Sequence, residues 1–370
     1  MSKNNPINVW SYLEEYYQYE DEVLDIVKEV LRSGKLILGP NVENFEKEFS
    51  DWVGGGYGTG VGNGTDAIKL SLLSVGIKTD DEVITVANTA VPTISAIVDC
   101  GAKPVFCDID QETYNIDTLK IDELISKKTK AILAVHLYGH PADIENLKKL
   151  CKKYNLVLIE DCAQAHGSKY KNKKCGDFGK ASAFSFYPTK TLGGFGDGGL
   201  VYTSSKKIDE KLKMLRFYGM KDRYFSEIDG INSRLDEVQA AILRFKLKRL
   251  DDDIARRREI ASIYNEELKD LELVLPYEKK DNYHSYYLYV VRNKNRNKII
   301  EELKKNNINV NISYPWPIHT MPPFKNCFYN DLKNTEKLSK EIFSLPMYPK
   351  LEESQIQKTI EILKKSINLK

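Results

Sequence analysis

The sequence predicts an α/β fold, with a large domain built on a mainly parallel central sheet and a smaller C-terminal α+β domain. Between residues 62 and 203, short β-branched runs alternate with longer amphipathic stretches. This alternation is typical of parallel strands that are buried on both faces and separated by helices. From about residue 233 a long, charge-rich helical pattern follows. The length of 370 residues exceeds one typical core, so two domains are expected.

Six segments of the large domain are predicted as strands, because each is rich in apolar and β-branched residues. They are EVITV (82–86), PVFCDI (104–109), AILAVHLYG (131–139), LVLIED (156–161), ASAFSF (181–186) and GLVYTS (199–204). The segment 142–155 between them carries apolar residues on one helical face and is predicted as a helix. Functional residues in such sheets gather beyond the carboxyl ends of the strands.

The C-terminal part begins with one long predicted helix over 234–268, which has almost no glycine or proline and connects the domains. It is followed by a predicted strand over 283–292 and by helices over 297–308 and 356–368. We therefore expect residues 1–250 to form the N-terminal arm and the large domain, including the connecting helix. Residues 251–370 would form the small domain.

Composition narrows the classes of function. Lys and Arg number 55 against 53 Asp and Glu, so no strong field recruits nucleic acid or a membrane surface. No secretory leader or long apolar span is visible, so a soluble cytoplasmic protein is expected. The six cysteines are scattered without a CxxC pair, which favours buried thiols over disulfides and indicates no metal site.

Two glycine-rich stretches suggest phosphate binding. In VGNGTDA (61–67) the glycines precede an amphipathic helix, whose N-terminal amides suit an anion. This stretch and GFGDGG (194–199) both fit the glycine spacing of dinucleotide-binding motifs. Neither has the required context, because the first begins beyond residue 60 and the second leads into a strand. A dinucleotide-dependent oxidoreductase is therefore disfavoured, and a capped helix without a ligand remains an alternative for the first.

A set of four features points to pyridoxal phosphate (PLP). Glu160 and Asp161 end a predicted strand, and successive residues of a strand face opposite sides, so one of them faces the ligand edge. Ser185 ends the next strand, and Lys190 follows it among apolar residues and glycines. A lysine shielded from water becomes a nucleophile. PLP needs an amine partner for its aldehyde, an acid for its pyridine nitrogen and donors for its phosphate.

These motifs resemble the sugar aminotransferases of the DegT/DnrJ/EryC/StrS family, which have the fold-type-I aspartate aminotransferase architecture. The resemblance spans nearly the whole chain. It rests on SGKLILGPNVENFEKEF (33–49), GNGTDA (62–67), DCGAKPVFCDID (99–110), EDCAQAHG (160–167), FSFYPTKTLGGFGDGG (184–199), GINSRLDEVQAAIL (230–243) and YPWPIHTMPPF (314–324).

The resemblance implies a role for each matching residue. Lys190 would form the Schiff base with the PLP aldehyde and move protons during catalysis. Asp161 would pair with the pyridine nitrogen, and Gln164 would bond the ring hydroxyl. The phosphate would be held by Ser185 and by the Gly64–Thr65–Asp66 turn. In this family an asparagine from the neighbouring subunit completes the phosphate pocket, and Asn232 stands in that place, which implies a homodimer with shared active sites.

The resemblance also implies the reaction. Glutamate would leave its nitrogen on the cofactor as pyridoxamine phosphate, and a nucleotide-linked keto-6-deoxyhexose, expected to be dTDP-linked, would receive it. Tyr187, Tyr314 and His319 resemble substrate-facing residues, although His319 also fits a structural role. Ala90 stands where the family commonly has an aromatic residue stacked on the cofactor ring, a departure similar to members that aminate the third carbon. Amination at the fourth carbon is the alternative.

Two further alternatives stay open at this point. The related sugar dehydratases carry histidine where Lys190 stands, so the lysine argues against them. A non-catalytic regulator that binds the cofactor would be distinguished by the lack of amino transfer.

Overall fold

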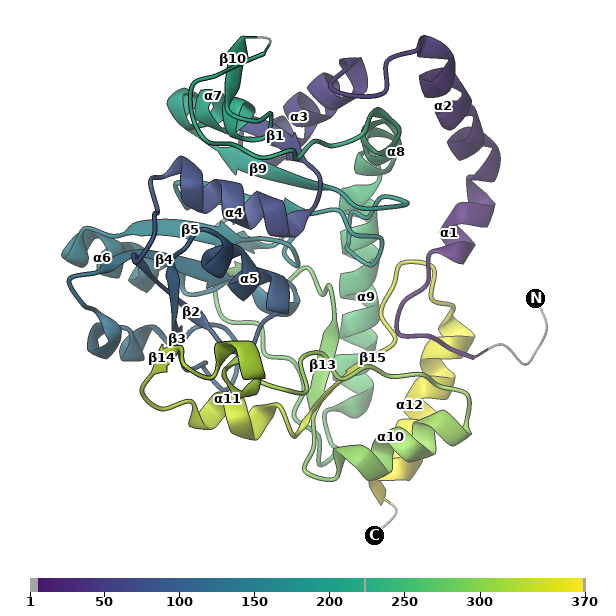
Figure 1. Ribbon diagram of the computed structural model, residues 1–370. Helices are drawn as coiled ribbons and strands as arrows, with labels where there is room; N and C mark the ends of the chain where they lie inside the picture. Colours follow the sequence, from purple (N-terminus) through teal and green to yellow (C-terminus); the bar gives the residue numbers. More distant parts are fainter. Residues whose placement is uncertain (1–5, 223, 369–370) are drawn as a thin grey trace.

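The computed structural model describes residues 6–222 and 224–368. Its centre is one sheet of eight strands in the order β1-β9-β8-β5-β4-β2-β3-β14 (Figure 1). The strands are β1 (Tyr57–Val61), β2 (Glu82–Val86), β3 (Lys103–Cys107), β4 (Thr129–Val135), β5 (Val157–Asp161), β8 (Ala181–Ser185), β9 (Gly199–Thr203) and β14 (Phe328–Tyr329). Only β9 runs antiparallel to its neighbours, β1 and β8. The predicted mainly parallel sheet is therefore confirmed.

The six predicted strands all appear, with one clear difference in length. The prediction over 131–139 is too long, because β4 ends at Val135 and the next residues turn. A short 3₁₀ turn covers Leu137–Gly139, and Tyr138 within it has a left-handed φ of 59°. The turn lies at the carboxyl edge of the sheet, where the His136 amide donates to the Asp161 carbonyl.

Helices cover both faces of this sheet (Figure 1). The helices of the large domain are α3 (Pro40–Val53), α4 (Gly64–Ser74), α5 (Val91–Asp99), α6 (Ile144–Tyr154), α7 (Lys206–Leu215) and α8 (Glu237–Leu247). Successive residues of a strand pack in two different hydrophobic cores, one on each face of the sheet. Val83 packs in the core that contains residues of α4, α5 and α7, whereas Ile84 packs in the core that contains residues of α6. The continuous apolar runs of the sequence follow from this burial on both faces.

The expectation of one long connecting helix over 234–268 is wrong. The structure has two helices there, α8 and then α9 (Leu250–Leu268), separated at Lys248 and Arg249. Each buries its own apolar face, because Leu243 packs with the residues of α3 and Ile260 packs in the small core. No glycine or proline marks this junction, so the packing of the two halves sets the break.

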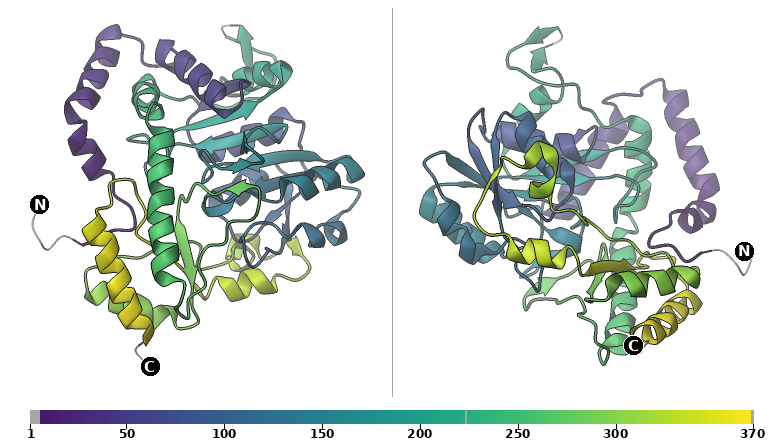
Figure 2. Two further views of the ribbon diagram at one scale, coloured as in Figure 1. Left: turned by 180° about the vertical axis from the view of Figure 1, so that it is seen from behind. Right: turned by 60° about the horizontal axis from the view of Figure 1, so that its bottom comes forward.

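The C-terminal part forms a second core around the small sheet β13 (Tyr289–Arg292) and β15 (Ile342–Leu345). Helices α9, α10 (Arg296–Lys305) and α12 (Glu353–Asn368) pack on it, as Figure 2 shows from two sides. The predicted strand over 283–292 is shorter than expected. Asn282–Tyr283 forms β12, which pairs instead with β6 (Lys169–Tyr170) next to β7 (Lys173–Lys174).

Several segments cross between the two halves of the chain. The segment after residue 312 returns to the large sheet, where β14 pairs with β3 and α11 (Lys333–Leu338) follows. Conversely, Ile7 of the N-terminal arm packs in the small core. The division of the chain at residue 250 remains a prediction.

The N-terminal helices stand apart from the sheet. Helices α1 (Leu13–Gln18) and α2 (Glu20–Ser33) lie on the side of α8 and α9 that faces away from it (Figures 1 and 2). The remaining short strands, β10 (Met220–Asp222) and β11 (Phe225–Ser226), form a hairpin after α7. None of the described helices combines the length and apolar character needed to cross a bilayer.

Candidate active site

A cavity of about 490 Å³ opens at the carboxyl ends of β2, β4, β5 and β8, beside the first turn of α4. Most of the residues that sequence reasoning selected line this one cavity. They are Gly64, Thr65, Asp66, Asp161, Gln164, Ser185, Tyr187 and Lys190. Parallel strands place their ends at one edge of the sheet, which explains why residues from distant parts of the chain meet here.

One end of the cavity suits a phosphate. Asn63 caps α4, and its side chain accepts the Asp66 amide at 2.9 Å. Among the described residues the amides of Gly64 and Thr65 have no acceptor, so they are available to an anion. The Asp66 amide, which was expected to share this role, is already engaged by its cap. A Cβ at Gly64 would lie 2.6 Å from the Cβ of Ser185, so the Ser185 hydroxyl and the helix start meet only because this residue is glycine.

The lining of the cavity also carries a buried carboxylate. Asp161 is 5% exposed and accepts from the Ala163 amide at 3.1 Å and from the Thr93 hydroxyl at 2.9 Å. Burial raises the pKa of Asp161, while these two hydrogen bonds and the charge of Lys190 oppose the rise. A protonated ring nitrogen beside it would supply the missing positive partner. The prediction that only one of Glu160 and Asp161 faces the ligand edge is confirmed.

Glu160 points to the other face of the sheet, where its interactions are structural. Its carboxylate accepts the amides of Gly176 and Phe178, both at 2.8 Å. It also lies 2.9 Å from Nε2 of His136, whose Nδ1 accepts the Ala142 amide. Glu160, His136 and Cys175 could together contact a metal ion by proximity. The hydrogen bonds already made by the glutamate and the histidine account for their burial without one.

Lys190 lines the same cavity. It is held in a turn in which its amide donates to the Tyr187 carbonyl at 2.8 Å. Its amine lies 4.8 Å from the centre of the Tyr287 ring. In the described part of the chain no carboxylate pairs with this amine. A lysine that lines a cavity and has no carboxylate partner can react with an aldehyde.

Gln164 links the cavity to the C-terminal half of the chain. Its Oε1 accepts the Tyr138 amide at 2.8 Å, and its Nε2 donates to the Tyr314 hydroxyl at 2.6 Å. Tyr314 has a left-handed φ of 61°, a strained conformation for a bulky residue. Its ring stacks with that of Tyr138 at 6.5 Å. Tyr314 therefore lies one hydrogen bond away from the cavity lining, and Tyr187 lies on the lining itself, half exposed.

Three of the selected residues do not line this cavity: Tyr314, described above, and Asn232 and His319. Asn232 is exposed on the surface, while its neighbour Ser233 is buried and donates to Asp66 at 2.5 Å. His319 is buried against Tyr329, and its Nε2 lies 3.1 Å from Glu336. These contacts favour a structural role for His319, which was one of the two alternatives that the sequence left open.

Sequence reasoning missed several residues of the site. Thr93 and Thr89 form a chain of hydroxyls that ends on Asp161, with 3.0 Å between the two oxygens. Asp197 lines the cavity, and Tyr287 covers the Lys190 amine. The signal in the sequence for Thr93 is its place shortly after the predicted strand that becomes β2, in ANTAVPT.

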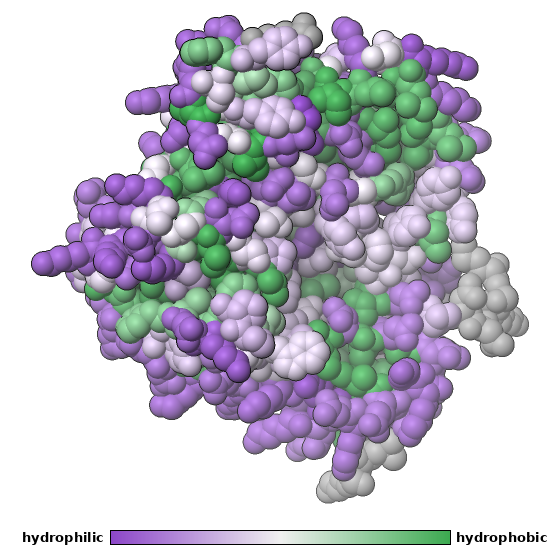
Figure 3. All heavy atoms as spheres, in the orientation of Figure 1, coloured by the Kyte–Doolittle hydropathy of each residue, from purple (hydrophilic) through white to green (hydrophobic). Residues whose placement is uncertain are grey.

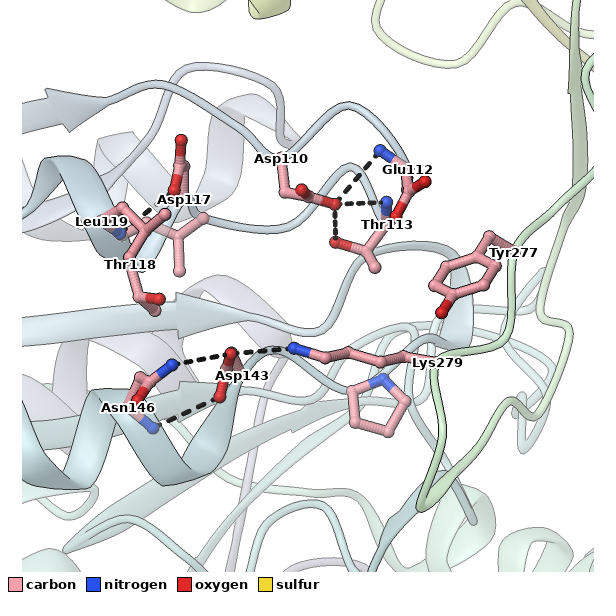
Figure 4. A pocket seen from close by; sticks show the side chains of 12 residues that line it. Asp110, Glu112, Thr113, Asp117, Thr118, Leu119, Asp143, Asn146, Tyr277 and Lys279 are labelled. Carbon is pink, nitrogen blue, oxygen red and sulfur yellow. Dashed lines mark hydrogen bonds and ion pairs between the residues drawn. The ribbon is translucent and has the colours of Figure 1, made fainter.

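A second cavity, of about 320 Å³, lies between the segment after β3 and the start of α6 and contains none of the selected residues (Figure 4). Its carboxylates are engaged locally. Asp110 accepts the amides of Glu112 and Thr113, and Asp143 pairs with Lys279 at 2.9 Å. These contacts explain the acidic lining as turns and an ion pair.

Comparison with known proteins identifies the chain. The model of the DegT/DnrJ/EryC1/StrS aminotransferase family matches residues 18–364. The chain belongs to this family. Its members depend on PLP, so the chain is a PLP-dependent aminotransferase with the aspartate aminotransferase-like fold. The family, fold class, enzyme class and cofactor expected from the sequence are all confirmed.

Individual relatives are close over the full length. The chain is 48% identical over 367 residues to the dTDP-3-amino-3,4,6-trideoxy-alpha-D-glucose transaminase of Micromonospora megalomicea subsp. nigra, covering 97% of this chain and 98% of the relative. It is 43% identical to the dTDP-3-amino-3,6-dideoxy-alpha-D-galactopyranose transaminase of Aneurinibacillus thermoaerophilus, covering 93% and 95%. The crystal structure of S. venezuelae DesV in complex with a ketimine intermediate has a TM-score of 0.96, with 36% identity and 99% of each chain covered.

The residues of the cavity fit PLP. The free amides of α4 and the Ser185 hydroxyl would hold its phosphate, Asp161 its ring nitrogen, and Gln164 its ring hydroxyl. When bound, PLP supplies an electron sink for the substrate's amine carbon. The protein's own task is then to keep Asp161 ionised beside the ring, to exclude water, and to move a proton with the Lys190 amine.

Proposed function

We propose that this enzyme transfers an amino group from glutamate to the third carbon of a nucleotide-linked 3-keto-6-deoxyhexose, with dTDP as the nucleotide. The observation that carries the proposal is the meeting of Lys190 and Asp161 in one cavity, in a chain with two dTDP-3-amino-sugar transaminases among its relatives. Lys190 would move the proton in both halves of the reaction, so that a single amine serves donor and acceptor in turn.

Ala90 supports amination at the third carbon. It forms the N-cap of α5 and lines the cavity with a methyl group only, in place of the aromatic ring common in the family. The two named relatives differ in their sugar but agree on the third carbon. Transfer to a 4-keto sugar is the remaining alternative, because the open face beside Ala90 does not by itself set the carbon presented to the amine.

Tyr187 and Tyr314 are the residues that we assign to the sugar substrate. Tyr187 lies on the cavity lining with 51% of its surface exposed, so its ring can cover a bound molecule. Tyr314 reaches the cavity through Gln164. We do not assign His319 to the substrate, because Glu336 and Tyr329 contact its ring.

The enzyme would act as a homodimer. Asn232 is exposed on a loop whose neighbour Ser233 is tied to the first turn of α4, so the loop is fixed but its asparagine is free to reach outward. Exposed Leu24, Leu31, Leu36 and Ile37 form part of the apolar surface over α2 and the following segment, at the upper right of Figure 3. Apolar surface of this kind marks protein interfaces.

The free thiols of the described cysteines suit the reducing cytoplasm, where we place the reaction.

The test is an incubation of the purified enzyme with glutamate and a panel of dTDP- and GDP-linked 3-keto and 4-keto sugars. Mass spectrometry and NMR of the products identify the aminated carbon. Amino transfer to the third carbon of a dTDP sugar is expected. Amination at the fourth carbon alone would overturn the assigned position, and the absence of any amino transfer would favour a non-catalytic regulator.

A further inference from the structure

Lys190 also lines a separate, much smaller cavity. It has a volume of about 30 Å³, which is room for one water molecule. Lys190, Thr191, Asp253 and Arg257 line it, together with residues of the N-terminal arm. Lys190 is therefore shared by this cavity and the larger one.

Two buried polar atoms on the lining residues have no partner among the described residues. Arg257 is 2% exposed; one of its terminal nitrogens donates to the Met347 carbonyl at 2.9 Å, but its Nε has no acceptor. The Thr191 hydroxyl, on a residue that is 9% exposed, likewise has none. Unpaired buried polar groups are costly, and ordered water commonly satisfies them.

Glu15 and Lys246, which also line the cavity, form an ion pair at 2.9 Å, but Asp253 has no such partner among the described residues. Within the described chain Arg257 makes no ion pair, although Asp253 lies four residues earlier on the same helix, α9. Burial lowers the pKa of Arg257 to about 10 and raises that of Asp253. A bridging molecule that accepts a hydrogen bond from the guanidinium and donates one to the carboxylate would stabilise the charged form of both residues.

We infer that this cavity holds one ordered water molecule, which bridges Arg257, Thr191 and Asp253 and positions the amine of Lys190. The water accepts from the Arg257 Nε–H and donates to the Asp253 carboxylate. The Thr191 hydroxyl and the Lys190 amine complete its four partners. The water thereby gives the Lys190 amine a fixed hydrogen-bond partner in the small cavity whenever the amine is not bonded in the larger cavity. Thr191, Asp253 and Arg257 are accordingly positioning residues.

The first test is a crystal structure at a resolution that shows ordered waters, solved for the cofactor-free and the PLP-loaded protein. A single water peak within hydrogen-bonding distance of Arg257 Nε and the Thr191 hydroxyl is expected in both. An empty cavity would overturn the inference. So would a chloride ion, which an anomalous-scattering measurement on chloride-soaked crystals would reveal.

The second test uses Thr191→Val, which keeps the side-chain shape and removes the hydroxyl. We expect this variant to lose the water peak and to slow the half-reaction with glutamate about tenfold, the effect of one lost hydrogen bond of average strength. The primary isotope effect with α-deuterated glutamate should increase, because proton transfer through a misplaced Lys190 becomes more rate-limiting. Thr191→Ser should restore wild-type behaviour.

Matched controls separate positioning from stability. Thr359→Val removes another buried hydroxyl, which donates to the Gln355 carbonyl at 2.8 Å in α12, and should change the melting temperature without changing the isotope effect. If Thr191→Val does not fold, Asp253→Asn at a half-buried position takes its place. An unchanged isotope effect in the folded variant would overturn the positioning role. The kinetic test rests on the proposed use of glutamate as the amino donor. If the wild-type enzyme does not react with glutamate, that proposal is wrong, and the crystal structures alone test the water site.

Discussion

The Thr93 hydroxyl donates to the Asp161 carboxylate at 2.9 Å, which ties the first turn of α5 to the end of β5. We expect Thr93→Val to leave the fold intact but to let Asp161 rotate away from the cofactor's ring nitrogen. The affinity for PLP should then fall about ten- to a hundredfold, which corresponds to one hydrogen bond to a charged group. Fluorescence titration of the cofactor-free protein measures this affinity. Thr93→Ser, which keeps the hydroxyl, should bind PLP as the wild type does, and equal affinity in the valine variant would contradict the role.

Asp161 should make the cofactor-free protein less stable as the pH rises. Burial raises the pKa of Asp161 in the folded state, so the folded protein holds this proton at pH values where the unfolded chain has lost it. The free energy of unfolding should therefore decrease from about pH 4, the ordinary pKa of an aspartate, upward to the raised pKa. Asp161→Asn should remove this slope, which urea unfolding at a series of pH values would show. A variant with the same slope as the wild type would assign the effect to other groups.

Gly64→Ala should damage the phosphate end of the cavity. The added Cβ would lie 2.6 Å from the Cβ of Ser185, closer than real side-chain contacts allow. The affinity for inorganic phosphate and for PLP should fall by about tenfold or more, because the helix start and the serine can no longer approach each other. The double variant Gly64→Ala with Ser185→Gly relieves the clash and should recover part of the loss beyond the additive expectation. Strict additivity would argue against a direct contact.

Lys190 should be the residue that bonds the cofactor. Borohydride treatment of the PLP-loaded enzyme should bleach its visible absorption and fix the label on the peptide that contains Lys190. Lys190→Ala should lose amino transfer by at least about a hundredfold, the low end of what a positioned proton-transfer group contributes. Its melting temperature should change little, because the side chain makes no ion pair within the described chain. Label on any other lysine would refute the assignment.

Asn232 should act in the neighbouring subunit, which mixed dimers can reveal. Lys190→Ala and Asn232→Ala homodimers should each have low activity. In a mixed dimer, the site that keeps its own Lys190 receives an intact Asn232 from the other chain, so one of two sites becomes wild type. The purified mixed dimer should therefore have about half of the wild-type activity, and a statistically exchanged mixture of equal amounts about a quarter. No recovery in verified mixed dimers would place Asn232 outside the shared pocket.

The central strands of the sheet were predictable because each is an apolar run long enough to stand out from its surroundings. β1 was not, because YGTGV contains two glycines that weaken the strand pattern. β14 was not, because its two residues form a strand only through their pairing with β3, more than 200 positions earlier. The break between α8 and α9 also has no local signal, since it follows from which core each helix joins.

For the site too, some residues could be predicted from the local sequence, whereas others depend on contacts between distant parts of the chain. Lys190 and Asp161 could be predicted because each follows a recognisable strand, and parallel strands bring their ends together. Thr93 could not, because its hydroxyl finds Asp161 only through the placement of α5 against β5, 68 residues apart in the chain. His319 lies between prolines, a context that fits a substrate loop or a buried contact equally well, and only the packing with Tyr329 distinguishes them.

The pairing of β14 with β3 has a consequence for how the protein is made. β3 leaves the ribosome long before Phe328 and Tyr329, so during synthesis the nascent sheet has an uncovered edge for more than 200 residues of elongation. At typical translation speeds that interval lasts roughly ten seconds or longer. A chain cut after residue 250 would keep this edge permanently, and we expect such a fragment to aggregate where the whole chain stays in solution.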